Sequence, residues 1–419
     1  MTVTINGRPL SGSVAAVPSK SDLHRLLICA ALSDRRTVIG AGAAPLSDDV
    51  SASVRCLRAL GASIEAKDGV LAVTPVEPAP RATLDVGESG STFRFLLPVA
   101  AALGVRTEFI LRGRLSERPT GPLFDALRLH GASVEGEGTD RIAVSGKITG
   151  GEYLIDAGIS SQFVTGILFA LAALGGGSVR LLGKAESTPY IMMTLGALSR
   201  FGVDARFNGG VITVKGRPVS PGAVFAEGDW SSAAFWLCAG AASGGVTVTG
   251  LDASSRQGDR AILGVLRKMG ATVTESGEEI AVSGGNLRGI VFDASDCPDL
   301  VPPVAALAAV SDGETVVRGA SRLRIKESDR LAALASSLGA IGADIKETGD
   351  GLVIRGRKTL PGGDADSFSD HRIAMAVAVA SVRSGRIALS GAGSVGKSYP
   401  GFWQDFRKLG GNVDITEEK

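Results

Sequence analysis

A glycine between the end of a helix and the start of a strand recurs six times, about 70 residues apart. The six glycines are Gly61, Gly131, Gly202, Gly270, Gly342 and Gly410. A helix that ends at glycine and leads directly into a strand uses the left-handed conformation that glycine adopts cheaply. The pattern therefore predicts six similar α/β repeats over nearly all 419 residues. Repeats this long exceed those of simple solenoids and indicate closed domains, which divide most simply into two groups of three.

Composition and charge narrow the class of protein. Hydrophobic residues make up 44% of the chain and aromatic residues 5%, as expected for the aliphatic core of an α/β protein. A net charge of +1 argues against a nucleic-acid-binding face, so anions must be bound by local clusters. No apolar run reaches the ~18 residues of a membrane span, and the first residues lack a signal-peptide pattern. Four cysteines without metal-ligand spacing indicate buried thiols in a reducing cytoplasm.

Each repeat is expected to contain one apolar and one amphipathic helix. The apolar helices are expected over 21–32, 91–103, 161–174, 231–243, 299–310 and 370–382. The amphipathic helices are expected over 49–60, 118–130, 189–201, 259–269, 327–341 and 400–409, with Pro119, Pro189 and Pro400 in their first turns. Ser, Thr and Asp, the preferred N-cap residues, precede the apolar helices. Because helix N-termini attract anions, these ends predict phosphate or carboxylate binding.

The segment Gly391–Ser398 matches the phosphate-binding loop of nucleotide-dependent enzymes. Glycines occupy the equivalent place in the other repeats, at positions 40, 113, 183, 250 and 319. Gly391 is therefore expected to be a structural turn. A nucleotide-binding domain would also need several strands beyond Ser398, and too few residues follow. We predict that this segment does not bind ATP.

Two dense charge clusters, Arg322–Arg330 and Ser369–Arg372, precede predicted helices. Either cluster could be a solvated helix start. Alternatively, several cations could surround one carboxylate or phosphate, for which arginine is well suited. His371 lies between an aspartate and an arginine. The three histidines show no paired ligand spacing, so no metal site is expected.

Short motifs distributed over the whole chain resemble those of the 5-enolpyruvylshikimate-3-phosphate synthases, in the family's order. They are Pro18–Ser21 with His24-Arg25, Glu117–Pro119, Ser160–Phe163, Pro189-Tyr190, Glu227–Asp229, Pro298-Asp299, Lys326–Arg330, Asp370–Arg372 and Lys397.

The resemblance implies a two-domain inside-out α/β barrel, each domain built from three βαβαββ repeats. Domain I would comprise residues 1–18 and 229–419 and domain II residues 19–228, with a two-strand hinge near 18–20 and 227–229. The implied reaction transfers the enolpyruvyl group of phosphoenolpyruvate to the 5-hydroxyl of shikimate 3-phosphate, through a tetrahedral intermediate that releases phosphate. This step belongs to chorismate and aromatic amino-acid biosynthesis. The resemblance also implies a cytoplasmic monomer without metal or organic cofactor, and without membrane or nucleic-acid partners.

The resemblance assigns the following residues by motif. Shikimate 3-phosphate would be bound by Lys20, Ser21, Arg25, Ser160, Ser161, Gln162, Ser187, Tyr190, Asp299, Arg322 and Lys326. Phosphoenolpyruvate would be bound by Lys20, Gly90, Arg118, Gln162, Arg330, Arg372 and Lys397. The catalytic residues would be Asp299, Glu327, Lys20 and His371. Asp299 would accept the proton of the attacking hydroxyl, and Glu327 would exchange a proton with the methylene carbon.

Three positions depart from the family pattern. The family's glycine before Ser19-Lys20-Ser21 is absent, leaving Val17-Pro18-Ser19, and Glu88 and Arg322 stand where many members have asparagine. Arg322 could instead bind the phosphate of shikimate 3-phosphate. None of the three is a proposed acid or base, and they leave the response to glyphosate open.

Three alternatives differ in class. The sister transferase that acts on UDP-N-acetylglucosamine usually has a cysteine before the equivalent of Arg118-Pro119, and residues 111–120 contain none. A non-catalytic sugar-phosphate-binding protein would be expected to lack Asp299 or Glu327, and both are present. A nucleotide-dependent enzyme would rest on Gly391–Ser398 alone.

Overall fold

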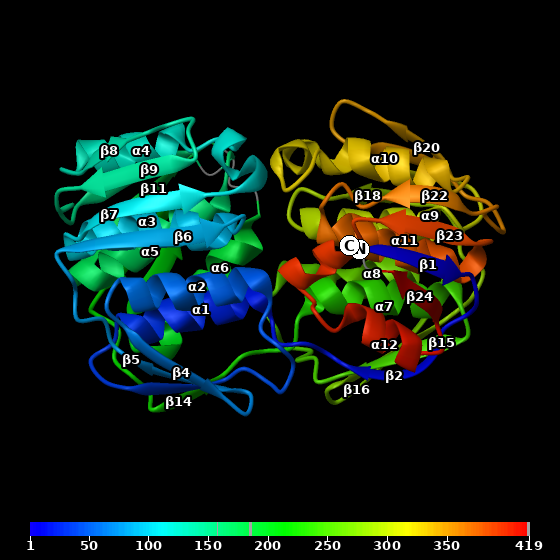
Figure 1. Ribbon diagram of the computed structural model, residues 1–419, viewed down its shortest axis with the longest axis horizontal. Helices are drawn as coiled ribbons and strands as arrows, with labels where there is room; N and C mark the ends of the chain where they lie inside the picture. The colour runs from blue at the N-terminus through cyan, green and yellow to red at the C-terminus, as the bar shows by residue number, and fades with distance from the viewer. Residues whose placement is uncertain (157, 184–186, 417–419) are drawn as a thin grey trace. The chain divides into compact units, whose positions relative to one another are not determined.

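The computed structural model describes residues 1–156, 158–183 and 187–416. Its internal contacts divide the chain into two compact units, each described separately below (Figure 1). Unit 1 comprises Met1–Val17 and the chain from Glu227 onward, and unit 2 comprises Pro18–Ala226. The chain therefore passes from one unit to the other twice, next to Pro18 and next to Glu227. A hinge at these two crossings stays a prediction.

Three four-stranded sheets form the described part of each unit, and each sheet belongs to one βαβαββ repeat. The first repeat of unit 2 contains β14 (Ala223–Phe225), α1 (Lys20–Ala31), β3 (Thr37–Gly40), α2 (Asp48–Ala59), β4 (Ser63–Lys67) and β5 (Val70–Thr74). The second contains β6 (Arg81–Gly87), α3 (Gly90–Leu103), β7 (Arg106–Leu111), the 3₁₀ turn η1 (Gly113–Glu117), α4 (Gly121–Leu129), β8 (Ser133–Glu135) and β9 (Arg141–Ser145). The third contains β10 (Glu152–Asp156), α5 (Ser161–Leu174), β11 (Gly176–Leu182), α6 (Thr188–Arg200), β12 (Asp204–Asn208) and β13 (Val211–Lys215).

The repeats of unit 1 follow the same order, with additional 3₁₀ turns. The first contains β2 (Ser11–Ala15), α7 (Trp230–Ala242), β15 (Gly245–Thr249), η2 (Gly258–Ala261), α8 (Ile262–Met269), β16 (Thr272–Ser276) and β17 (Glu279–Ser283). The second contains β18 (Val291–Asp293), η3 (Pro298–Leu300), α9 (Val301–Ala308), β19 (Glu314–Arg318), η4 (Ser321–Ile325), α10 (Arg330–Ala340), β20 (Asp344–Glu347) and β21 (Leu352–Arg355). The third contains β22 (Gly363–Asp366), α11 (His371–Ala380), η5 (Ser381–Arg383), β23 (Ile387–Ser390), η6 (Ala392–Lys397), α12 (Phe402–Lys408), β24 (Asn412–Thr416) and β1 (Thr2–Asn6).

Within each repeat the first two strands are parallel and the last two form an antiparallel hairpin. In the β10–β13 sheet, for example, β10 pairs in parallel with β11, and β12 pairs antiparallel with β13. The first helix of each repeat is buried along almost its whole length, as α5 and α11 illustrate. The sheets therefore enclose the apolar helices, and the predicted inside-out α/β class is confirmed.

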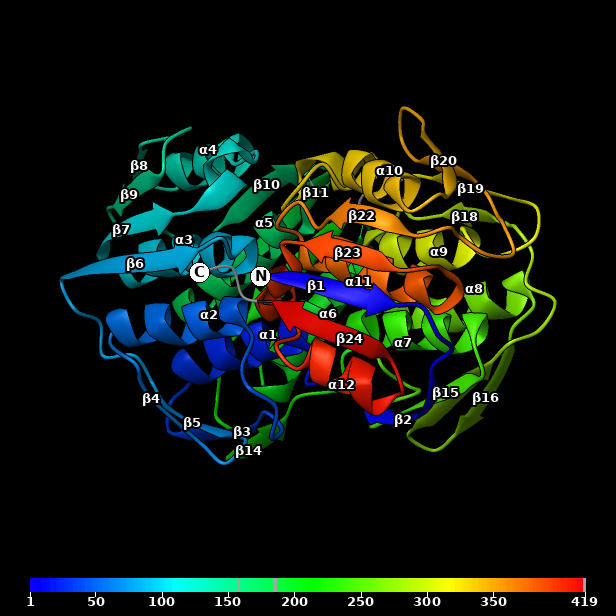
Figure 2. The same ribbon diagram turned by 45° about the vertical axis from the view of Figure 1, so that its right-hand side comes forward.

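Three strands complete sheets whose other strands lie far away in sequence. β1 pairs with both β23 and β24, so the first strand of the chain fills the last place of the final repeat (Figure 2). β2 pairs with β15, and β14 pairs with β3. Each of these two strands leads along the chain into a helix of the other unit but pairs within its own unit. The two crossings of the chain therefore follow from strand pairing.

The glycine pattern adopts the predicted backbone conformation. The six repeat glycines have φ values between 72° and 112°, in the left-handed region. Gly391 also has a left-handed φ of 66° and begins η6, a 3₁₀ helix of six residues. A short 3₁₀ turn replaces the long helix that follows a nucleotide-binding loop. The prediction that Gly391 is a structural turn is confirmed.

The helices differ from the prediction mainly at their first turns. Pro189 lies in the first turn of α6 as predicted, but the prediction was wrong for Pro119 and Pro400. The helices after these two prolines begin at Gly121 and Phe402. Arg118 has extended backbone angles, as the steric effect of a following proline favours, so a helix cannot start there. Helices α8 and α9 also begin late, after the 3₁₀ turns η2 and η3.

No helix in the described part of the chain is long and apolar enough to cross a membrane.

Candidate functional site

In unit 1, one buried arginine connects three acidic residues from separate parts of the chain. Arg330, the first residue of α10, donates from Nε to Asp370 Oδ2 at 2.7 Å and from Nη1 to Asp299 Oδ1 at 2.9 Å. Its Nη2 donates to Glu327 Oε2 at 2.5 Å. The Arg330 side chain is 2% exposed. We call Asp299, Glu327, Arg330, Asp370 and Arg372 the Arg330 cluster.

Asp370 holds the cluster to the start of α11. As the N-cap of that helix it accepts from the backbone N–H of Arg372 at 2.9 Å. Its second carboxylate oxygen accepts from Arg330 and, at 3.0 Å, from the hydroxyl of Ser328. Because Asp370 is fully buried, these donors replace the water that its charge has lost. The helix start and the arginine are thereby fixed together.

Asp299 is bound by a second arginine. Arg372 donates from Nη2 to Asp299 Oδ2 at 3.0 Å. Burial alone would raise the pKa of Asp299. The charge of Arg372, followed by those of Lys326 and Arg330, outweighs burial and holds this pKa well below its usual range. Asp299 is therefore ionised at neutral pH.

The remaining predicted residues of unit 1 lie at helix or turn ends. His371 is the first residue of α11, and its Nδ1 lies 3.8 Å from Asp370 Oδ1. Lys326 follows η4 and is half-buried. The guanidinium of Arg322 donates to the backbone carbonyl of Ser295 at 2.8 Å, and Lys397, at the end of η6, donates to that of Ser369 at 2.7 Å.

In unit 2, two arginines lie so close to Gly90 that a side chain there would have to displace them. A Cβ atom at Gly90 would lie 2.8 Å from Nη1 of Arg118 and 2.9 Å from Nη1 of Arg94. Arg94 also donates to Gln162 Oε1 at 2.8 Å, and Gln162 Nε2 donates to Ser91 Oγ at 3.0 Å. The starts of α3 and α5 thus present amide and guanidinium donors together.

Arg25 joins α1 to α6. Its guanidinium donates to Thr194 Oγ1 and to the backbone carbonyls of Ser21 and Tyr190, at 2.7–3.0 Å. Burial lowers the pKa of Arg25 to about 10, so it still carries its charge at neutral pH. Ser187 is the N-cap of α6 and accepts from the Tyr190 N–H through its backbone carbonyl at 3.0 Å. Its φ of 54° is unusual for a non-glycine residue.

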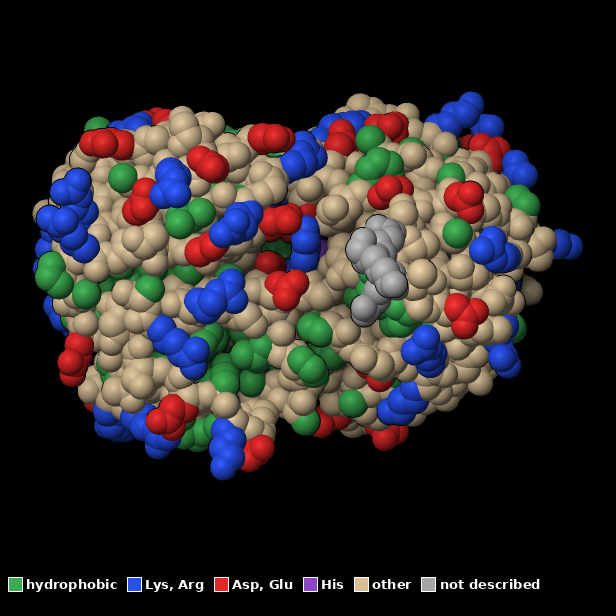
Figure 3. Space-filling view, in the orientation of Figure 1, with side chains coloured by type: hydrophobic (Ala, Val, Ile, Leu, Met, Phe, Trp, Pro, Cys, Tyr) green, Lys and Arg blue, Asp and Glu red, His purple; other side chains and the backbone are tan. Residues whose placement is uncertain are grey.

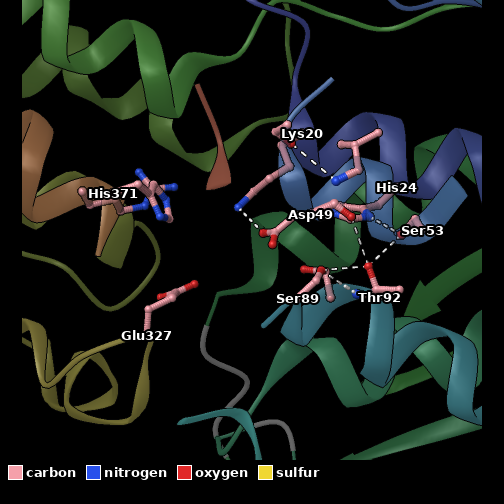
Figure 4. A network of polar contacts seen from close by, with 12 residues as sticks. Lys20, His24, Asp49, Ser53, Ser89, Thr92, Glu327 and His371 are labelled. Atoms are coloured by element: carbon pink, nitrogen blue, oxygen red, sulfur yellow. Dashed lines mark hydrogen bonds and ion pairs between the residues drawn. The ribbon is translucent and has the colours of Figure 1, made fainter. Parts of the chain in front are cut away.

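The first turns of α1 and α5 hold the other predicted residues of unit 2. Lys20 Nζ forms an ion pair with Asp49 Oδ2 at 2.8 Å (Figure 4). Ser160 is the N-cap of α5 and accepts from the backbone N–H of Gln162 at 3.3 Å. Ser161 is the next residue and is buried. Within each unit most of the predicted residues therefore lie at or near helix starts, where the helix dipole favours anions. Arg322 and Lys397 lie instead in the 3₁₀ turns η4 and η6.

The surface shows no comparable clustering of positively charged side chains on the face in Figure 3. Basic and acidic side chains are interspersed over the face shown in Figure 3. Within residues 1–156, 158–183 and 187–416, no group of three or more His, Cys, Asp or Glu side chains could hold a metal ion. The cations that could bind an anionic substrate are instead those at the helix starts.

Comparisons with known proteins agree with this arrangement. The sequence model of the EPSP synthase (3-phosphoshikimate 1-carboxyvinyltransferase) family matches residues 5–406. The chain belongs to this family. It is 42% identical to the 3-phosphoshikimate 1-carboxyvinyltransferase of Clostridium kluyveri and 40% identical to that of Clostridium perfringens, in both cases over 98% of each chain. It is also similar to the solved EPSP synthase of Acinetobacter baumannii, with 26% identity and a TM-score of 0.83 over 99% of this chain and 100% of the other.

Several polar residues of this EPSP synthase family member escaped the sequence analysis. They are Asp49, which pairs with Lys20; Arg94, which bonds to Gln162; and Asp370, which the sequence placed in a cluster without a role. Arg94 could have been noticed as a charged residue inside an otherwise apolar helix. The importance of Asp49 depends on a partner 29 residues away, which no local pattern reveals.

Asp259 is a further buried carboxyl that sequence reasoning missed. It is 2% exposed, and its Oδ2 accepts from the hydroxyl of Ser231 at 2.5 Å. Burial, reinforced by the negative charge of Asp299, raises the pKa of Asp259 to about 7. The sequence pattern predicts that Asp259 begins an amphipathic helix, but Asp259 lies in η2, before α8.

Proposed function

We propose that the protein transfers the enolpyruvyl group of phosphoenolpyruvate to the 5-hydroxyl of shikimate 3-phosphate and releases inorganic phosphate. The Arg330 cluster supports this proposal, because two carboxylates that can accept and donate protons, Asp299 and Glu327, are hydrogen-bonded directly to guanidinium groups. Membership of the EPSP synthase family supplies the reaction class.

The proposed binding roles follow the charges of the two substrates. Phosphoenolpyruvate carries a phosphate and a carboxylate, which arginines can bind through paired N–H donors. Its proposed ligands are Lys20, Gly90, Arg118, Gln162, Arg330, Arg372 and Lys397. The proposed ligands of shikimate 3-phosphate are Lys20, Ser21, Arg25, Ser160, Ser161, Gln162, Ser187, Tyr190, Asp299, Arg322 and Lys326.

Two carboxylates are proposed to move the protons. Asp299 accepts the proton of the attacking 5-hydroxyl, and Glu327 delivers a proton to the methylene carbon and later removes one, with Lys20 and His371 assisting. Addition builds positive charge on the carbon that bears the ether oxygen. A nearby carboxylate stabilises that charge as well as transferring protons.

Arg330 and Arg372 make the proton affinity of the Asp299 carboxylate depend on substrate binding. Without substrate, Arg330 and Arg372 donate to Asp299, and Arg330 also donates to Glu327. An anionic substrate bound to these guanidinium groups shares their positive charge. The proton affinity of Asp299 then rises, which suits it to accept the proton of the attacking hydroxyl when phosphoenolpyruvate is bound.

Phosphate release tests the function. The purified protein should release inorganic phosphate from phosphoenolpyruvate only when shikimate 3-phosphate is present. Phosphate release with UDP-N-acetylglucosamine, and none with shikimate 3-phosphate, would instead establish the sister reaction. The same assay without an acceptor measures background hydrolysis of phosphoenolpyruvate.

We further propose that the protein is a cytoplasmic monomer. The four cysteines are buried free thiols, which supports a reducing compartment. Analytical ultracentrifugation at working concentration tests the monomer, and cell fractionation tests the location.

A further inference from the structure

Four buried side chains connect the N-terminal halves of α1, α2 and α3 in unit 2. His24 Nδ1 lies 2.8 Å from Ser53 Oγ, Ser53 Oγ lies 2.8 Å from Thr92 Oγ1, and Thr92 Oγ1 lies 2.8 Å from Ser89 Oγ (Figure 4). All four residues are at most 1% exposed. We call His24, Ser53, Ser89 and Thr92 the hydroxyl chain.

Taken together as hydrogen bonds, the three contacts of Thr92 Oγ1 allow one direction. Thr92 Oγ1 also donates to the backbone carbonyl of Asp49 at 3.3 Å. A hydroxyl has one proton and two acceptor sites, so Thr92 accepts from both Ser53 and Ser89. Ser53 then has no proton left for His24 and must accept from it. The donor to Ser53 is therefore an N–H at Nδ1 of His24.

The surroundings of His24 agree with a neutral ring protonated at Nδ1. Its Nε2 is buried and has no hydrogen-bond partner among the described residues, and the ring meets Phe95 edge-on with centroids 6.3 Å apart. In either neutral tautomer Nε2 is unsatisfied, as a donor or as an acceptor, so the contacts of Thr92 decide which nitrogen carries the proton. Burial, followed by the charges of Lys20 and Arg25, also holds the pKa of His24 well below its usual range.

The hydroxyl chain contacts two places that the proposed function uses. From the middle of the chain, Thr92 holds the backbone of Asp49, whose carboxylate pairs with Lys20 at 2.8 Å. At the end of the chain away from His24, Ser89 caps α3 immediately before Gly90 and accepts from the backbone N–H of Thr92 at 3.2 Å. Lys20 and Gly90 are both proposed ligands of phosphoenolpyruvate.

We propose that His24 is a positioning residue, which donates from Nδ1 into the hydroxyl chain and thereby sets Lys20 and the Gly90 backbone for phosphoenolpyruvate. This inference rests on the proposed function for the identity of the substrate. The direction of the hydrogen bonds does not depend on it. His24 itself does not need to touch the substrate.

The tautomer can be measured on the unmodified protein by NMR after ¹⁵N-histidine labelling. The sequence contains three histidines, so His24→Asn identifies the His24 signals by their loss. At pH 7 we expect His24 to carry a proton on Nδ1 and none on Nε2. Protonation at Nε2, or at both nitrogens, would overturn the proposed direction of the chain.

Two matched pairs of variants test the positioning role. Thr92→Val removes the central hydroxyl and keeps the shape, whereas Thr92→Ser keeps the hydroxyl. His24→Gln moves the amide beyond Nδ1, whereas His24→Asn keeps an N–H close to the Nδ1 position. We expect the first member of each pair to raise the KM for phosphoenolpyruvate about tenfold, the size expected for one lost buried hydrogen bond, with a smaller change in kcat. The second members should stay within about threefold of the parent.

The results separate this inference from the proposed function. An unmodified protein that releases no phosphate would reject the proposed function, and the NMR result would still decide the direction of the chain. An active protein in which Thr92→Val leaves the KM for phosphoenolpyruvate unchanged would overturn the positioning role. A rise confined to the KM for shikimate 3-phosphate would also overturn it. Thermal unfolding of each variant shows whether it is folded at the assay temperature.

Discussion

The Nε atom of Arg330 donates to Oδ2 of Asp370 at 2.7 Å, and both side chains are almost completely buried. Burial alone would lower the pKa of Arg330, but the charges of Asp370, Glu327 and Asp299 raise it above its ordinary value. A charge pair in this position contributes little net stability while complete. The loss of one partner leaves the other charge buried without compensation.

Asp370→Ala should therefore destabilise the protein by about 3–5 kcal/mol and reduce activity, because Arg330 loses its buried anchor. Urea denaturation measures the change in the free energy of unfolding. Glu314→Gln is the matched control, since Glu314 pairs with Arg355 at 3.0 Å on the surface. The control substitution should lower the free energy of unfolding by less than about 1 kcal/mol. Equal losses in the two variants would contradict the structural importance of the Arg330–Asp370 pair.

Glu327→Gln and Asp299→Ala should bind substrates but turn over slowly. Removal of a general acid or base typically lowers kcat by about 10²–10⁴-fold. The KM for phosphoenolpyruvate should not rise, because each substitution frees a guanidinium from an internal carboxylate. Steady-state kinetics with both substrates measures these constants, and Glu347→Gln, which alters an exposed contact of Arg324, serves as control. Near-normal kcat in both variants would rule out the proposed roles.

Gly90→Ala should weaken the binding of phosphoenolpyruvate with little loss of stability. The added methyl group would meet the ends of two flexible side chains, Arg118 and Arg94, which can move aside. A displaced guanidinium that costs about 1.4 kcal/mol of binding raises the KM about tenfold. Gly264→Ala is the control, because its Cβ meets nothing within 4 Å. An unchanged KM in Gly90→Ala would show that neither arginine needs its observed position.

Asp259 predicts a pH dependence of stability. Its pKa of about 7 in the folded protein exceeds the value near 3.9 of an unfolded chain, so the folded state binds the proton more tightly. Stability is lost as the pH rises from about 4 to 7, and the loss is complete above 7. Asp259→Asn removes this penalty and should stabilise the protein by roughly 2 kcal/mol more at pH 8 than at pH 5. Chemical denaturation at both pH values measures the difference, with exposed Asp414→Asn as control.

If Asp259→Asn increased the free energy of unfolding equally at pH 5 and pH 8, Asp259 would not titrate between these two pH values. The asparagine keeps an oxygen that can accept from Ser231, so the variant changes charge without removing that hydrogen bond.

Local chemistry made much of the fold predictable from the sequence. The repeat glycines mark helix ends because few other residues tolerate the left-handed conformation. The apolar helices were recognisable because burial on every side excludes polar residues from them. The same repeat predicted that Gly391 is a structural turn and not part of a nucleotide-binding loop. Most of the motif-based site residues lie at or near helix starts, as their N-cap neighbours indicated.

Tertiary structure alone decided which residues became partners. The pairing of β2 with β15 and of β14 with β3 joins segments more than 180 residues apart, and no local pattern specifies such contacts. Arg330 could have faced solvent at the start of α10. Its burial against Asp299 and Asp370 depends on three helix starts that only the folded unit brings together. The sequence by itself determined which helices are apolar and where helices end at a glycine, because those rules act over a few residues. Which charges lost their water, and therefore which pKa values shifted, depended on packing across the whole unit.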